Sequence, residues 1–128
     1  MYEDVPAAID WLGKIFGFEE HYRYGDPPDG AQMHLGNAWI MLRKARPGSA
    51  SPAQIGCETQ SLTVFVEDVD ERFQHLKDAG ARIVEQLHEP PYGELQFAAL
   101  DLEGHHWLFS RHVRDVAPSD WGARVVHA

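Results

Sequence analysis

Two segments repeat apolar residues at the three- and four-residue steps of an amphipathic helix. The first runs from Pro6 to about Phe16, with Asp4 before it as an N-cap and Gly17 at its end. The second runs from about Val69 to Ala79 and is closed by Gly80. We expect the buried stripes to consist of Ile9, Leu12, Ile15 and Phe16 in the first helix, and of Val69, Phe73 and Leu76 in the second.

Most of the remaining pattern is typical of short β-strands bounded by turn residues. Gly36-Asn37 and the segment 101–104 predict two hairpins. The stretch 45–60 is rich in Pro, Gly, Ser and Ala and predicts a linker that divides the chain nearly in half. The expected strands are 21–25, 31–36, 38–43, 61–66, 82–87, 95–100 and 106–111.

The two halves resemble each other. Glu3-Asp4-Val5 and Glu67-Asp68-Val69 each precede a helix, and the segment 36–41 matches the segment 104–109. We interpret this as a duplicated unit of one strand, one helix and three strands. The opening strand of the first unit is truncated, either because the gene begins upstream or because the protein keeps only a stub.

The composition bounds the classes of function. The chain has 128 residues and is expected to form one domain, with a first module at about 1–44, a second at about 61–112 and a C-terminal tail at 113–128. A net charge of −9 without a basic patch argues against a nucleic-acid partner. The single cysteine, Cys57, excludes an internal disulfide and a multi-thiolate zinc site. We find no membrane span or signal peptide and expect a cytoplasmic protein.

Several motifs carry a resemblance to a known superfamily. They are the segment 7–12 running into 16–19, the segment 64–70, and the turn Asp101-Leu102-Glu103-Gly104-His105. Together they resemble the vicinal oxygen chelate superfamily, which includes glyoxalase I, bleomycin-resistance proteins and extradiol dioxygenases. The resemblance implies an α+β fold with two βαβββ modules that form a curved mixed sheet around a cavity, usually completed in a homodimer.

The resemblance also implies four positions for the ligands of a divalent metal. Three of these positions hold Ile40, Ser61 and Leu108, and the fourth would lie before Met1. Leucine and isoleucine have no lone pairs to offer a metal ion. We therefore expect neither a metal nor another cofactor.

Strand alternation then predicts the cavity wall, since successive side chains point to opposite faces. If Leu108 faces the cavity, Trp107 and Phe109 face the helices, and by the duplication Trp39 and Met41 pack beneath a helix. In the strand at 61–66, the core residues are expected to be Leu62, Val64 and Val66. The ligand-binding residues predicted in this way are Ile40, Leu42, Ser61, Thr63, Phe65, Gln96, His106, Leu108 and Ser110.

Such a cavity suits an apolar or aromatic small molecule. Our first hypothesis is metal-independent binding of such a molecule by a homodimer, as in antibiotic sequestration. The alternative is a glyoxalase-like lyase or isomerase, or a dioxygenase-type enzyme, with a displaced metal that uses His34, His106 or Glu94, or with His106 as a metal-free acid–base catalyst. A third hypothesis is a non-catalytic interaction domain with a collapsed cavity.

Overall fold

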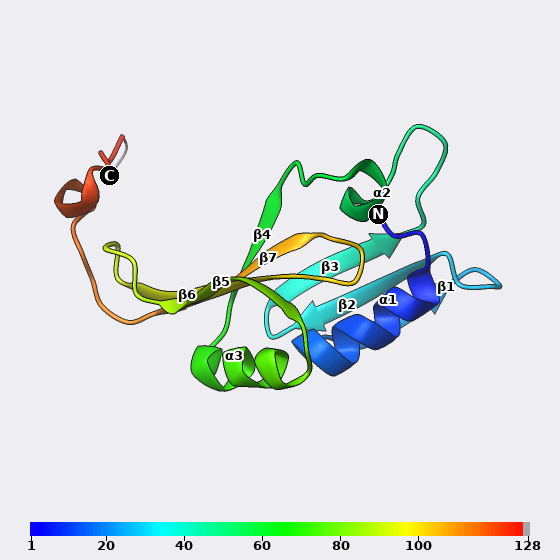
Figure 1. The fold of residues 1–128 in the computed structure, drawn as a ribbon, viewed down its shortest axis with the longest axis horizontal. Helices are drawn as coiled ribbons and strands as arrows, with labels where there is room; N and C mark the ends of the chain where they lie inside the picture. Colours follow the sequence, from blue (N-terminus) through cyan, green and yellow to red (C-terminus); the bar gives the residue numbers. More distant parts are fainter. Residues whose placement is uncertain (127–128) are drawn as a thin grey trace.

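The computed structural model describes residues 1–126 and shows an α+β fold with two β-sheets (Figure 1). The first helix, α1, spans Val5–Trp11 and continues as a π-helical turn, η1, over Leu12–Phe16. The Asp4 carboxylate accepts a hydrogen bond of 3.0 Å from the Ala7 amide and caps the helix. Gly17 ends it with a φ of 85°, in the left-handed region that favours glycine. Both predicted ends are therefore confirmed.

The first half forms a three-stranded antiparallel sheet in the order β1-β2-β3. Its strands are β1 (Glu19–Tyr24), β2 (Gly30–Leu35) and β3 (Ala38–Arg43). Leu35 pairs with Ala38 across the expected Gly36-Asn37 turn.

Tyr2 occupies the place expected for the opening strand of the first module. It forms an isolated parallel bridge with Lys44, just beyond β3. The Tyr2 amide donates to the Arg43 carbonyl at 2.9 Å, and the Ala45 amide donates to the Tyr2 carbonyl at 2.9 Å. The bridge is parallel, as is the pairing of the first strand of the second half, residues 61–65, with its last strand, residues 106–112.

The expected linker contains a short helix, α2, over Pro52–Ile55. The Ser51 side chain and the Gln54 side chain cap it reciprocally. The Ala53 amide donates to the Glu103 carbonyl at 2.9 Å. The linker is therefore fixed to a turn of the second half, which the Pro- and Gly-rich composition did not predict.

The second half forms a four-stranded mixed sheet in the order β4-β7-β6-β5. The pair β4·β7 is parallel, and the pairs β6·β7 and β5·β6 are antiparallel. The elements are β4 (Ser61–Phe65), α3 (Val69–Asp78), β5 (Arg82–His88), β6 (Glu94–Leu100) and β7 (His106–His112). Each half thus repeats the predicted order of elements.

One core joins the two halves. Helices α1 and α3 lie on the same side of the sheets (Figure 1), and their predicted apolar stripes face the core. The Phe16 ring packs edge-on against the rings of Trp107 and Phe109, with distances between ring centroids of 5.5 Å and 5.0 Å. Phe18 contacts Trp107 at 5.4 Å. Because aromatic residues of the first half pack on β7, the two modules bury one continuous apolar interior.

The predicted orientation of β3 is wrong. Trp39 is 54% exposed and Met41 is 56% exposed, whereas Leu42 is buried in the core and Ile40 packs against it. The strand therefore presents to the core the residues that alternation had assigned to the cavity. The turn between β2 and β3 has two residues, whereas five residues separate the paired Leu100 and His106. Because the two turns differ in length by an odd number of residues, β3 and β7 enter their sheets out of step by one residue. A shift of one residue in a strand moves all of its side chains to the other face of the sheet.

The second sheet follows the prediction more closely. Trp107 and Phe109 are buried in the core, as expected. In β4, Val64 is buried and Val66 packs against the core just beyond the strand. Leu62 was also expected in the core, but it is 38% exposed because β4 lies at the edge of its sheet.

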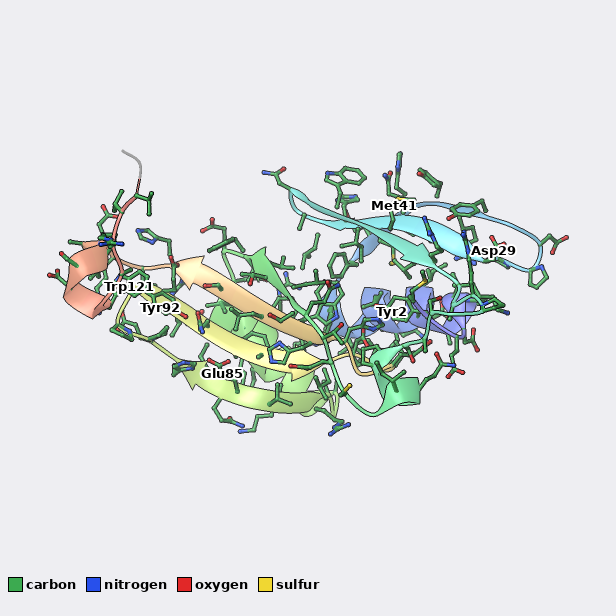
Figure 2. The ribbon with its side chains drawn as sticks, turned by 90° about the horizontal axis from the view of Figure 1, so that it is seen from above. Tyr2, Asp29, Met41, Glu85, Tyr92 and Trp121 are labelled. Carbon is green, nitrogen blue, oxygen red and sulfur yellow. The ribbon has the colours of Figure 1, made fainter. Side chains whose placement is uncertain are left out.

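The C-terminal tail leaves β7 and ends, within the described residues, near a short 3₁₀ helix, η2 (Pro118–Trp121). The Trp121 ring contacts the Tyr92 ring at 5.4 Å (Figure 2). Residues 127 and 128 of the predicted tail lie outside the described residues. Across residues 1–126, no helix has the length and apolarity needed to cross a membrane.

Candidate functional site

The side of the second sheet that faces away from the helices brings together most of the predicted ligand-binding residues. Across β4 and β7, the ladder pairs Ser61 with His106, Thr63 with Leu108, and Phe65 with Ser110. On the next strand, Gln96 pairs with Ser110, and Ala98 with Leu108. We call this surface the second-sheet face, defined by Ser61, Thr63, Phe65, Gln96, Ala98, His106, Leu108 and Ser110.

The second-sheet face has an exposed apolar edge and a buried polar floor. Phe65 is 65% exposed, whereas Gln96 is 5% exposed and Ser110 is 2% exposed. Adjacent strands lie about 4.8 Å apart, so these three side chains follow one another across the sheet within roughly 10 Å. An aromatic ring resting on Phe65 would therefore lie close to polar groups of the floor.

A hydrogen-bond network extends this floor toward the tail. The Tyr92 hydroxyl donates to Gln96 Oε1 at 2.8 Å, and Gln96 Nε2 donates to Glu85 Oε1 at 3.2 Å. His88 Nε2 lies 3.0 Å from the same Glu85 oxygen. Tyr92 and Glu85 are labelled in Figure 2. Neither residue was among the predicted ligand-binding residues, although Tyr92 precedes Gln96 by only four positions in the chain.

Two polar atoms near this face have no partner within residues 1–126. They are Glu94 Oε2 and His106 Nδ1, and both atoms are buried. Buried polar atoms in native proteins are nearly always hydrogen-bonded, to protein or to another molecule. Each of these atoms therefore has capacity for a bond that the described chain does not supply.

The other oxygen of Glu94 is engaged by a histidine. His112 Nδ1 lies 3.3 Å from Glu94 Oε1, and His112 Nε2 lies 2.7 Å from Asp115 Oδ1 in the tail. The hydrogen bonds with Asp115 and then with Glu94 raise the pKa of His112 above its usual range. When protonated, His112 thus links the end of the second-sheet face to the tail.

A second open surface lies on the first sheet, opposite α1, and we call it the first-sheet face. Its exposed side chains are those of Tyr22, Tyr24, Trp39 and Met41, and Met41 in Figure 2 points away from Tyr2 and α1. His34 stacks on the Trp39 ring at 4.5 Å with an interplanar angle of 24°. Stacked and exposed aromatic rings are suited to a flat molecule.

The first-sheet face was not predicted, because Trp39 and Met41 were expected in the core and are instead exposed. The alternating Tyr22 and Tyr24 on β1 were the available signal, since they share one face of the sheet with His34. A cleft of about 530 Å³ lies where the β2–β3 turn meets β4, and Ala38, Thr63 and Phe65 help to line it. The cleft adjoins the exposed Phe65 ring of the second-sheet face.

A buried carboxylate fixes the turn that precedes β7. Asp101 Oδ2 accepts hydrogen bonds from the Tyr2 hydroxyl at 2.6 Å and from Trp107 Nε1 at 3.1 Å. Asp101 Oδ1 accepts from the amides of Glu103 and His105, each at 3.0 Å. Burial alone would raise the pKa of Asp101, but bonds from His105, Tyr2 and Trp107 outweigh it and lower the pKa. His105 is thus a structural turn residue.

The residues at the familiar metal positions do not fit a metal. Ile40 and Leu108 carry only hydrocarbon side chains, and Ile40 packs against the core. Among residues 1–126, no three His, Cys, Asp or Glu side chains gather closely enough to hold an ion. The superfamily's four-ligand site therefore cannot be assembled from these positions.

The fold and its two open faces define a protein of paired βαβββ modules. The sequence matches the Glyoxalase/Bleomycin resistance protein/Dioxygenase superfamily over residues 1–109. An uncharacterized protein of Mycobacterium bovis is 31% identical over 123 residues, covering 89% of this chain and 80% of that protein. The chain belongs to this superfamily.

Solved structures agree with this assignment. TioX from Micromonospora sp. ML1 has a TM-score of 0.73 and 33% identity, covering 91% of this chain and 94% of that one. The fosfomycin resistance protein FosX from Listeria monocytogenes has a TM-score of 0.65 and 15% identity, covering 88% of this chain and 91% of that one. At 15% identity, the second comparison shows a shared fold.

Proposed function

We propose that the chain binds an apolar or aromatic small molecule on its open sheet faces, without a metal, and that a second copy completes the binding cavity. The observation that carries the proposal is the set of large apolar side chains left uncovered there. Trp39 is 54% exposed, Met41 is 56% exposed and Phe65 is 65% exposed. Uncovered apolar surface of this kind is typical of binding sites.

The chemistry of the site favours binding over metal-assisted catalysis. Two of the positions that would hold a metal carry Ile40 and Leu108, and the floor of the second-sheet face contains the polar side chains of Gln96 and Ser110. A mostly apolar surface with a few fixed polar groups is the usual composition of a small-molecule site. Sequestration of an apolar compound, rather than turnover, is the corresponding activity.

Titration with the neutral planar dye Nile red tests the proposal. We expect saturable fluorescence enhancement that is unchanged after dialysis against a chelator. Trp39→Ala and Phe65→Ala should each weaken binding about tenfold, which corresponds to about 1.4 kcal/mol of lost contact. Ile55→Ala is the matched control, because Ile55 is 54% exposed but lies on α2, away from both faces.

Two results would count against the proposal. Loss of dye binding after chelation would show that a metal is needed. Equal effects of Ile55→Ala and Phe65→Ala would show that the dye binds unspecifically to exposed apolar residues. Sedimentation at several protein concentrations, with and without dye, would show whether a second copy takes part.

A further inference from the structure

The second-sheet face has an apolar ring at one side and an unsatisfied acceptor near its end. Phe65 on β4 and Glu94 on β6 both flank β7, where their ladder partners are Ser110 and His112. Those partners are two residues apart on β7, and the strands are separated by about 4.8 Å, so the two side chains lie roughly 12 Å apart. A fused aromatic ring with a short arm spans that distance.

The unsatisfied atom is Glu94 Oε2. It is buried and has no hydrogen-bond partner within residues 1–126, while Oε1 of the same carboxylate lies 3.3 Å from His112 Nδ1. An ionised carboxylate only accepts hydrogen bonds, so the missing partner must be a donor. The Glu94 side chain as a whole is 19% exposed, so the residue lies at the border of the open face, with Oε2 on its buried side.

Among residues 1–126, the neighbouring side chains do not supply that donor. The Gln96 amide oxygen accepts a hydrogen bond from Tyr92, and the Gln96 amide nitrogen donates one to Glu85. Arg111 lies next to His112 in sequence, but its guanidinium pairs with Asp70 at 3.7 Å. Within residues 1–126, the Glu94 carboxylate therefore has the His112 imidazole as its partner at Oε1 and no donor at Oε2.

We propose that the molecule bound on the second-sheet face is a flat aromatic compound with a positively charged amine arm, whose N–H group donates to Glu94 while its ring rests on Phe65. This inference depends on the proposed small-molecule binding and names the class of the ligand. Hydrogen bonds between a charged donor and a carboxylate are about twice as strong as neutral ones. The net charge of −9 also attracts a cation from a distance.

A matched series of three naphthalenes tests the charge of the arm by calorimetry. The probes are naphthylethylammonium, naphthylethanol and naphthylacetate, which share one ring and differ in the arm. We expect the ammonium probe to bind at least tenfold more tightly than the alcohol, and the acetate to bind most weakly. Glu94→Gln should reduce the preference for ammonium over alcohol to less than threefold.

Glu71→Gln is the matched control, because Glu71 lies in the first turn of α3, on the core side of the second sheet. It removes the same charge from the chain and should leave the preference intact. Salt titration separates the general attraction from the local bond, since the former is screened and the latter much less so.

The outcomes distinguish this inference from the proposed function. Equal binding of the ammonium and alcohol probes would overturn the inference, while the shared ring binding, weakened by Phe65→Ala, would sustain the proposed function. No binding by any probe would overturn both. If Glu94→Gln instead abolishes a dimer seen by sedimentation, the missing donor belongs to a second copy, and the inference is wrong.

Discussion

Removal of the Tyr2 hydroxyl should destabilise the fold measurably, although Tyr2→Phe deletes only one oxygen. The hydroxyl donates a 2.6 Å hydrogen bond to Asp101 Oδ2, and Tyr2 is 5% exposed, so water cannot easily replace it. A hydrogen bond to a charged group contributes about 1.5–3 kcal/mol. Because Trp107 Nε1 still donates to the same oxygen at 3.1 Å, we expect a loss of about 1.5–2 kcal/mol.

The pH dependence gives this prediction a second signature. The pKa of Asp101 is lowered in the folded state, so its contribution to stability is present above the ordinary value of 3.8 and is lost as the pH falls through the folded pKa. Loss of the Tyr2 bond makes that lowering smaller. The difference between the wild-type protein and Tyr2→Phe should therefore shrink when the pH falls from 7 toward 3.

Urea unfolding followed by tryptophan fluorescence at fixed protein concentration measures the effect. Tyr22→Phe is the matched control, because Tyr22 is exposed and its hydroxyl donates a weak hydrogen bond of 3.8 Å to the Met41 sulfur. It should change the free energy of unfolding by less than about 0.5 kcal/mol. A Tyr2→Phe effect no larger than that of Tyr22→Phe would refute the view that Asp101 depends on Tyr2.

Two further predictions test the orientation of β3 and the attachment of the tail. Leu42→Ala should lower the free energy of unfolding by about 2–5 kcal/mol, because it leaves a cavity in the core. Met41→Ala should lower it by less than about 0.5 kcal/mol, because Met41 is exposed. Both are measured by urea unfolding, and equal losses would contradict the observed orientation of β3. The His112–Asp115 contact should persist at low pH and be lost as the pH rises through the raised pKa of His112. The NMR signal of the Trp121 indole should then titrate with a midpoint above 6.5, and a titration unchanged in His112→Gln would refute this.

The order of helices and strands was predictable because local signals determine it. The apolar stripes of both helices face the core, and Gly17 and Gly80 end them with φ values of 85° and 78°. The strands begin and end within a few residues of the expected positions. These signals act within a few residues of one another, so an approximate alignment of the two halves does not disturb them.

The face that each strand presents was harder to predict, because it depends on the register of the whole hairpin. In β7, the aromatic residues Trp107 and Phe109 do face the core. In β3, the matching residues Trp39 and Met41 face outward, because the shorter β2–β3 turn changes which residues pair with the core side of β2. Sequence similarity between the halves therefore predicted the elements correctly and predicted the face of one strand wrongly.

The carboxylate that holds the Gln96 amide in the polar floor depends on a feature that no periodic pattern shows. In β5, Ile83 pairs with Ala99 on the core side, and strict alternation would place Glu85 on that side as well. A register shift between Ile83 and Glu85 instead places Glu85 opposite Ala98, on the open side, where it accepts a hydrogen bond from Gln96. A bulge of this kind redirects a carboxylate out of an apolar core and toward the open face of the sheet. Glu85 is thus positioned by backbone irregularity, whereas Gln96, Ser110 and the apolar residues of this face are positioned by alternation, and only the latter can be predicted from a sequence alone.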